Sequence, residues 1–187
     1  MLGSSRTSLA VVRDAVNGAF ADPALPQAGG DLLEITDLLG HERVLRAALG
    51  DSGRSGEERK AILQQLLADK VSPLGLSLAE TVVGQRWSSD ADMVDAMEIA
   101  GALALFGADE RAGTLDRTED ELFRFNRIAA SNDDLQLAIS DPAMPASAKS
   151  AIVTDLLEGK ATDTTIRLAS FVVTHLRGRR LDAALDQ

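Results

Sequence analysis

The sequence predicts an all-α protein that is built from two copies of one helical unit. Ala and Leu dominate, aromatic residues make up only 3% and there is no Tyr, whereas strands are enriched in β-branched and aromatic side chains. Residues 31–90 align with residues 121–180 without a gap, and 13 of these 60 positions are identical. A chain of 187 residues, of which 45% are hydrophobic, is long enough for two small domains with real cores.

The residues that signal the start of a helix also recur at matched positions of the two copies. Residues 55–58 (Ser-Gly-Glu-Glu) and 118–121 (Thr-Glu-Asp-Glu) both fit a capping box at a helix start. Ser72 precedes a Pro at the first helical position, and Thr162 stands at the matched place in the second copy. These matched signals favour a duplication over a chance resemblance of two Ala- and Leu-rich segments.

The individual helices follow from these signals and from the apolar spacing. We expect helices near residues 5–20, 31–39, 42–49, 56–68, 73–85, 90–112, 117–130, 132–139, 145–158 and 163–177. A Pro/Gly loop is expected from Asp22 to Gly30, and Gly40 and Gly159 are expected to stop helices. A last helical segment begins at Arg179 and reaches Gln187 without a stop signal, so we expect the natural chain to continue.

The helix expected near residues 73–85 is apolar on most of its sides. Leu76, Ala79 and Val83 form one stripe, and Leu78 and Val82 belong to a second stripe on the opposite side. The matched helix of the second copy repeats this pattern. Such a helix is either central in a bundle or completes its burial against a partner helix, and the sequence favours the first interpretation while leaving the second open.

The helix expected near residues 90–112 has two apolar faces, one of which contains Met97 and Ala100 and the other Leu103 and Phe106. It could close a first bundle, residues 1–112, with one face and open a second bundle, residues 90–187, with the other. The alternative is a plain linker helix. The sequence thus predicts two tandem six-helix-bundle-like units that share one helix.

Catalytic and ligand-binding patterns are missing from the sequence. The formal net charge of −10 disfavours nucleic-acid binding, and the lack of Cys excludes thiolate chemistry. The two His residues, His41 and His175, stand near helix ends, where a structural or solvated role is the usual one. No phosphate-binding loop, dinucleotide fingerprint or nucleophile elbow is present. We therefore expect a non-enzyme without cofactor or metal.

Membrane insertion is also disfavoured. No apolar run approaches the roughly 20 residues that span a bilayer, and the first residues lack the apolar core of a signal peptide. Any link to a membrane is therefore expected to go through a partner.

The order and spacing of several segments resemble the helical domain of the ATP synthase δ subunit, which is also known as the oligomycin-sensitivity (OSCP) subunit. These segments are residues 121–127, 135–141, 145–149, 155–160 and 177–182. The doubled form, in which residues 85–88 (Gln-Arg-Trp-Ser) end the first copy, looks like the long δ subunits of some bacteria. The resemblance covers the chain from Ser5 onward.

The resemblance implies a non-catalytic peripheral-stalk (stator) subunit on the cytoplasmic face of the plasma membrane. Such a subunit links the α/β catalytic head to the b-type stalk. The family's N-terminal unit is a six-helix bundle that binds an N-terminal helix of an α subunit between its first and fifth helices. Carried over, the two grooves comprise Leu9, Val12, Val16, Leu76, Ala79 and Val83 in the first unit, and Met97, Ala100, Ile166, Ala169 and Val173 in the second.

The chain stops before the family's C-terminal domain, which contacts the b-type stalk, so stalk binding is expected to depend on a domain absent here. Two other function classes stay open from the residues alone. A helical signalling or transcription-regulatory adaptor would need a basic recognition helix or a site for an acidic partner. The charge of −10 and the absence of a helix-turn-helix signature disfavour it. An enzyme with a carboxylate site would need convergent carboxylates of raised pKa.

Overall fold

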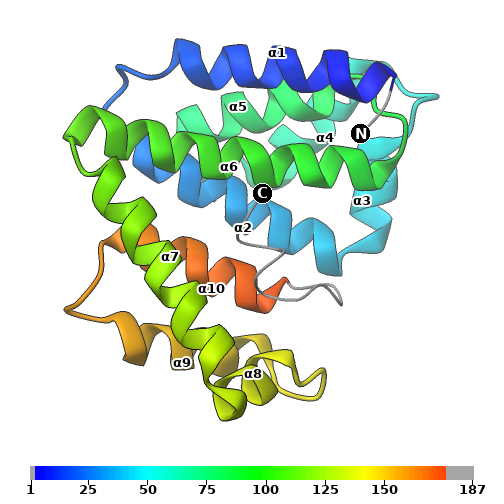
Figure 1. The fold of residues 1–187 in the computed structure, drawn as a ribbon. Helices are drawn as coiled ribbons and strands as arrows, with labels where there is room; N and C mark the ends of the chain where they lie inside the picture. Colours follow the sequence, from blue (N-terminus) through cyan, green and yellow to red (C-terminus); the bar gives the residue numbers. More distant parts are fainter. Residues whose placement is uncertain (1–2, 176–187) are drawn as a thin grey trace. The chain divides into compact units, whose positions relative to one another are not determined.

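The computed structural model describes residues 3–175, and these residues form ten α-helices and no strand (Figure 1). The prediction of an all-α fold is therefore confirmed for the described part of the chain. The helices are α1 (Ser4–Gly18), α2 (Leu25–His41), α3 (Arg43–Gly50), α4 (Gly56–Leu67), α5 (Pro73–Gly84), α6 (Asp90–Ala112), α7 (Leu115–Ser131), α8 (Asp133–Ser140), α9 (Ala146–Leu157) and α10 (Asp163–Thr174). The chain divides into two compact units, residues 1–111 and 112–187.

The sequence repeat extends to the helix boundaries. The helices α2, α3, α4 and α5 recur as α7, α8, α9 and α10, and each boundary of the second set lies 90 residues after its counterpart in the first. The helix α1 has its counterpart inside α6, because the same shift places Ser4–Gly18 on residues 94–108. The matched turns and caps of the two copies thus produce the same local structure.

The first unit packs its helices around one apolar core. The helix α5 lies against α1, α2 and α4. Trp87 is buried in this core and its indole Nε1 donates to the carbonyl of Val82 at 2.9 Å, so it closes the end of α5 within the first unit. The core residues with no exposed surface include Leu25, Leu32, Leu39, Leu49, Leu63, Ala79, Val83, Met93 and Met97.

The predicted loop from Asp22 to Gly30 is wrong from Leu25 onward, because α2 begins there. Its glycines have a packing role instead. A Cβ atom at Gly29 would lie 3.0 Å from the carbonyl oxygen of Gly101 and 2.8 Å from Leu105, so α2 and α6 cross at close range where both lack a side chain. In a sequence pattern, a glycine usually indicates a break in a helix. Here only the contact between α2 and α6 explains why a glycine lies inside a helix.

Most predicted caps are confirmed. Ser55 and Glu58 form the capping box of α4, and the hydroxyls of Ser72 and Thr162 accept from the third backbone N–H of α5 and α10. The second capping box is wrong, because Thr118 and Glu121 lie inside α7, which begins earlier. Gly159 follows α9 with a φ of 69°, as a helix stop should, whereas Gly40 lies within α2.

The second unit has a smaller core among its described residues. α10 packs against α9, α7 and α8. The core residues are Phe125, Ala129, Leu135, Ile139, Val153, Ala169 and Val173. The predicted end of α10 at residue 177 and the expected last segment from Arg179 to Gln187 lie outside the described residues.

Candidate partner-binding surface

The structure brings together the two helices that the resemblance implied for the first groove, since α1 lies against α5. Val12 and Val16 of α1 and Val83 of α5, like the adjacent Ala79, are fully or almost fully buried in the core of the first unit. Leu9 and Leu76 are half-buried and pack on the same core. Leu9 and Leu76 are therefore the members of this set with apolar surface that a partner could reach.

The second implied set is divided between the two units. Met97 and Ala100 lie on α6 and are buried in the core of the first unit. Ala169 and Val173 lie on α10 and are buried in the core of the second unit. Ile166, which matches Leu76 in the repeat, is half-buried.

A buried carboxylate positions α5 in the first unit. Asp31 of α2 is only 3% exposed. Its Oδ2 atom accepts hydrogen bonds from the backbone N–H of Ser72, at 2.8 Å, and from the hydroxyl of Ser72, while Nε2 of Gln27 donates to Oδ1 at 2.9 Å. A Cβ atom at Gly75 would collide with this carboxylate. The negative charge thus lies at the N-terminus of α5, where the helix dipole favours it.

The second unit repeats this contact with different residues. Oε2 of Glu121 accepts from the backbone N–H of Thr162, at 2.7 Å, and from the hydroxyl of Thr165, at 2.8 Å. Arg117 donates to Oε1 at 2.7 Å. The four positions match Asp31, Ser72, Gly75 and Gln27 in the repeat. Thr165 has a hydroxyl that donates to the carboxylate of Glu121. The matched residue of the first unit, Gly75, has no side chain, and a Cβ atom there would collide with the carboxylate of Asp31.

Burial of the Glu121 carboxyl group raises its pKa, but the hydrogen bonds from Thr162, Thr165 and Arg117 outweigh burial and hold this pKa below its ordinary value of 4.5. The ionised form therefore stabilises the second unit. This stability is fully present above the ordinary pKa and is lost as the pH falls through the lowered pKa of the folded state.

A Glu121→Gln variant is accordingly expected to be less stable than the wild type at neutral pH and to depend less on pH in the acidic range. Urea unfolding followed by circular dichroism, from about pH 6 to about pH 3, measures this difference. The exposed neighbour Glu119, changed to Gln, is the matched control. Equal pH dependence in the Glu121→Gln variant and the wild type would contradict the assignment.

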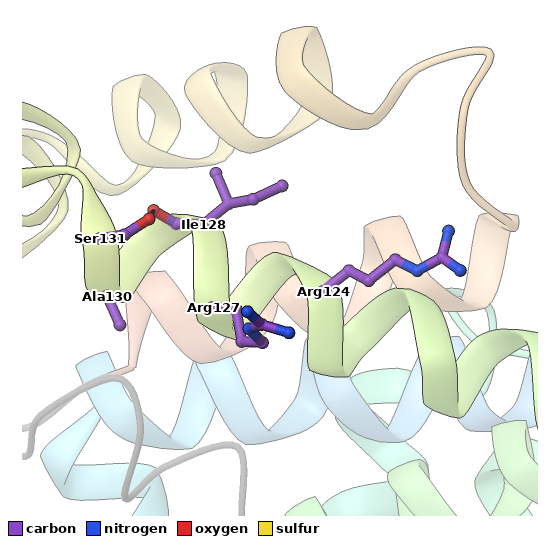
Figure 2. Close-up of a pocket in the computed structure, with 5 residues that line it drawn as sticks. All are labelled: Arg124, Arg127, Ile128, Ala130 and Ser131. Atoms are coloured by element: carbon purple, nitrogen blue, oxygen red, sulfur yellow. Dashed lines mark hydrogen bonds between the residues drawn. The ribbon is translucent and has the colours of Figure 1, made fainter.

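A second surface, which sequence reasoning missed, lies on α7. An open hollow of about 540 Å³ is lined by Arg124, Arg127, Ile128, Ala130 and Ser131, all of which project from this helix (Figure 2). The guanidinium of Arg127 lies 5.9 Å from the ring centroid of Phe123, within the range of a cation–π contact. We call Phe123, Arg124, Arg127 and Ala130 the α7 outer face.

The exposure of this face differs from that of its counterpart in the first unit. Phe123 is 62% exposed, whereas Leu33 at the matched position is 6% exposed; Ile128 is also 55% exposed. The two Arg residues replace Glu34 and Asp37 of α2, so the charge of the face is reversed. A comparison of the two aligned copies, in which acidic residues of α2 are replaced by Arg residues of α7, could have identified this face from the sequence.

Within residues 3–175, no group of three His, Asp or Glu side chains is placed to hold a metal ion. No helix of this part of the chain is sufficiently long and apolar to cross a membrane.

Comparison with known proteins gives a consistent result. The family model for the ATP synthase delta (OSCP) subunit matches residues 100–187. ATP synthase subunit delta of Streptomyces coelicolor is 39% identical over all of this chain and 69% of its own length. The same subunit of Salinispora arenicola is 38% identical over 98% of this chain and 68% of its own length. That of Nocardia farcinica is 38% identical over all of this chain and 70% of its own length.

These relatives are 38% or 39% identical to the chain over the aligned residues, and the alignment covers more than two thirds of each. The helical repeat and the resemblance drawn from the segment order agree with them. The chain belongs to the ATP synthase delta (OSCP) subunit family, whose members are non-catalytic stator subunits.

Proposed function

We propose that this chain ties the catalytic head of the ATP synthase to its peripheral stalk by binding N-terminal helices of α subunits. The recurrence of four helices at a spacing of 90 residues, with α5 and α10 held by matched carboxylates, is the observation that carries this proposal. A subunit that holds the head needs rigid helices at defined positions rather than a reactive group.

The proposed organisation is two tandem helical bundles, residues 1–112 and 90–187, which share α6. The counterpart of α1 falls inside α6, which supports a role for α6 as the first helix of the second bundle. Contact with the b-type stalk is proposed to require the C-terminal domain of the family. The complex would place this chain on the cytoplasmic face of the plasma membrane, without insertion of its own.

The groove itself is proposed to lie between α1 and α5, where Leu9 and Leu76 are half-buried above Val12, Val16, Ala79 and Val83. An amphipathic helix that inserts its apolar face there would complete the burial of both Leu side chains. Ile166, Ala169 and Val173 of α10 are proposed as the matched wall of a second groove.

A Leu76→Ser variant is expected to bind a synthetic peptide of the cognate α-subunit N-terminal helix at least about tenfold more weakly, because the anchor contact is lost. Isothermal titration calorimetry, with and without nucleotide, measures the affinity, and nucleotide is expected to have no effect. Ile166→Ser, at the matched position, reports whether the second unit also binds. Thermal unfolding monitored by fluorescence of Trp87, the only Trp, verifies that the first unit of the Leu76→Ser variant is folded.

No heat of binding with the wild-type chain would refute the groove. Equal affinities of the wild type and both variants would place the peptide elsewhere.

A further inference from the structure

We propose that Arg59 is a positioning residue of the groove between α1 and α5, because it fixes the C-terminal end of α5 against α4. The inference rests on the proposed function, since it concerns how the groove is held in the shape that a partner helix would enter. Asp31 already holds the N-terminus of α5. The helix is therefore fixed at its two ends by buried side chains of opposite charge.

The side chain of Arg59 reaches from the first turn of α4 to the end of α5. Arg59 is only 2% exposed, and its Nη2 atom donates to the carbonyl of Gly84, the last residue of α5, at 3.3 Å. The last carbonyls of a helix have no partner within the helix and carry the negative end of its dipole. A guanidinium at this place satisfies one of these carbonyls and is favoured by the dipole.

The backbones of α4 and α5 meet at close range beside this contact. A Cβ atom at Gly56, the first residue of α4, would lie 2.6 Å from the carbonyl oxygen of Gly84. A Cβ atom at Gly84 would lie 2.6 Å from Cε of Lys60. Because neither glycine has a side chain, the start of α4 reaches the end of α5 directly, and Arg59 bonds the two helices at this point.

The same end of α5 is also bonded to α1. Ser8 of α1 is buried, and its hydroxyl donates to the carbonyl of Arg86 at 2.6 Å. Leu9, which has apolar surface in the proposed groove, is the next residue of α1, and Val83 directly precedes Gly84. A shift of the end of α5 would therefore change the spacing between the Leu9 and Val83 sides of the groove.

The second unit does not repeat this arrangement. Lys149 stands at the position of Arg59 and is half-buried rather than buried. Ala146 and Thr174 replace the two glycines, and side chains at these positions would collide at the spacing of the first unit. The end of α10 thus cannot approach α9 as closely. We therefore expect the first unit to provide the more rigid of the two grooves.

The buried charge of Arg59 is costly for the fold itself. Burial lowers the pKa of this guanidinium, and the charge of Arg86 lowers it further, whereas Asp51 opposes the change. The Nε atom of Arg59 has no hydrogen-bond partner among the described residues. Replacement of a buried charge by an apolar side chain of similar volume is often neutral or stabilising. The position of α5, rather than the stability of the unit, is therefore the property that Arg59 serves.

An Arg59→Met variant separates these two roles. It is expected to bind the peptide of the cognate α-subunit N-terminal helix roughly fivefold more weakly than the wild type, because the partner must then order the end of α5. Its midpoint of urea unfolding, followed by the fluorescence of Trp87, is expected to equal or exceed that of the wild type. Isothermal titration calorimetry measures the affinity.

The matched control is Arg54→Met, an equal loss of charge at an exposed residue just before α4, which should bind as the wild type does. Arg59→Lys, which introduces the residue of the second copy, should bind with intermediate affinity, because the charge remains and the planar fork is lost.

Wild-type affinity of the Arg59→Met variant would overturn the positioning role and leave the groove in place. A lower unfolding midpoint together with weaker binding would assign Arg59 to the stability of the fold, and it would overturn the proposal as well. Absence of binding by the wild type and all three variants would instead refute the proposed function.

Discussion

An Asp31→Ala variant is expected to lose about 3 kcal/mol of the stability of the first unit, because three hydrogen bonds to a buried carboxylate are removed together. The backbone N–H of Ser72 would be left without this acceptor at the start of α5. Urea unfolding monitored by Trp87 measures this loss, since this only Trp is buried in the core of the first unit.

The matched control is Glu34→Ala, which removes an exposed carboxylate from the same helix. It is expected to change the stability by less than about 0.5 kcal/mol. If the two variants unfolded at the same urea concentration, the buried carboxylate would have no part in holding α2 to α5. A loss in the Asp31→Ala variant alone would show that the duplicated contact, rather than general surface charge, fixes the helix proposed to form the groove.

Three helices were predicted closely from the start and stop signals in their own sequence. The limits of α4, α5 and α6 follow closely from Ser55, from Ser72 with Pro73, and from the acidic first turn of α6. The repeat then carries the same boundaries into the second unit. Local signals of this kind depend only on neighbouring residues, so they can be read without knowledge of the fold.

The failures occurred where one residue serves a distant helix. Gly29 reads as a loop residue and Thr118 with Glu121 as a helix start, but in the structure Gly29 faces Gly101 and Glu121 binds the N-terminus of α10. The sequence pattern shows the type of each residue, but it does not show which residue of another helix that residue contacts. Asp31 and Glu121 stand at matched positions of the repeat, but the sequence does not show which helix each of them contacts.

The same limit applies to the candidate surfaces. Periodicity predicted that α5 and α10 are apolar on most sides, but it could not decide which stripe faces the core. The structure shows that Ala79 and Val83 are buried and that Leu76 retains exposed surface. The α7 outer face needed a comparison of exposure between the copies, which no single helix pattern contains.

A Gly29→Val variant is expected to destabilise the first unit by about 3 kcal/mol, because its side chain would have to enter the closest crossing of α2 and α6. A Cβ atom there meets the side chain of Leu105 at 2.8 Å and the backbone carbonyl of Gly101 at 3.0 Å. The side chain of Leu105 can turn aside, but the backbone of α6 can move only if the helix shifts. Urea unfolding with Trp87 fluorescence measures the cost.

Gly18→Val is the matched control, because a Cβ atom at the end of α1 would meet no other atom within 4 Å. Gly29→Ala should fall between the two, since it introduces the Cβ atom without the methyl groups. Equal stabilities of the two valine variants would mean that α2 and α6 need no close contact. A graded loss at position 29 alone would show that the crossing of α2 and α6 is fixed by backbone contact.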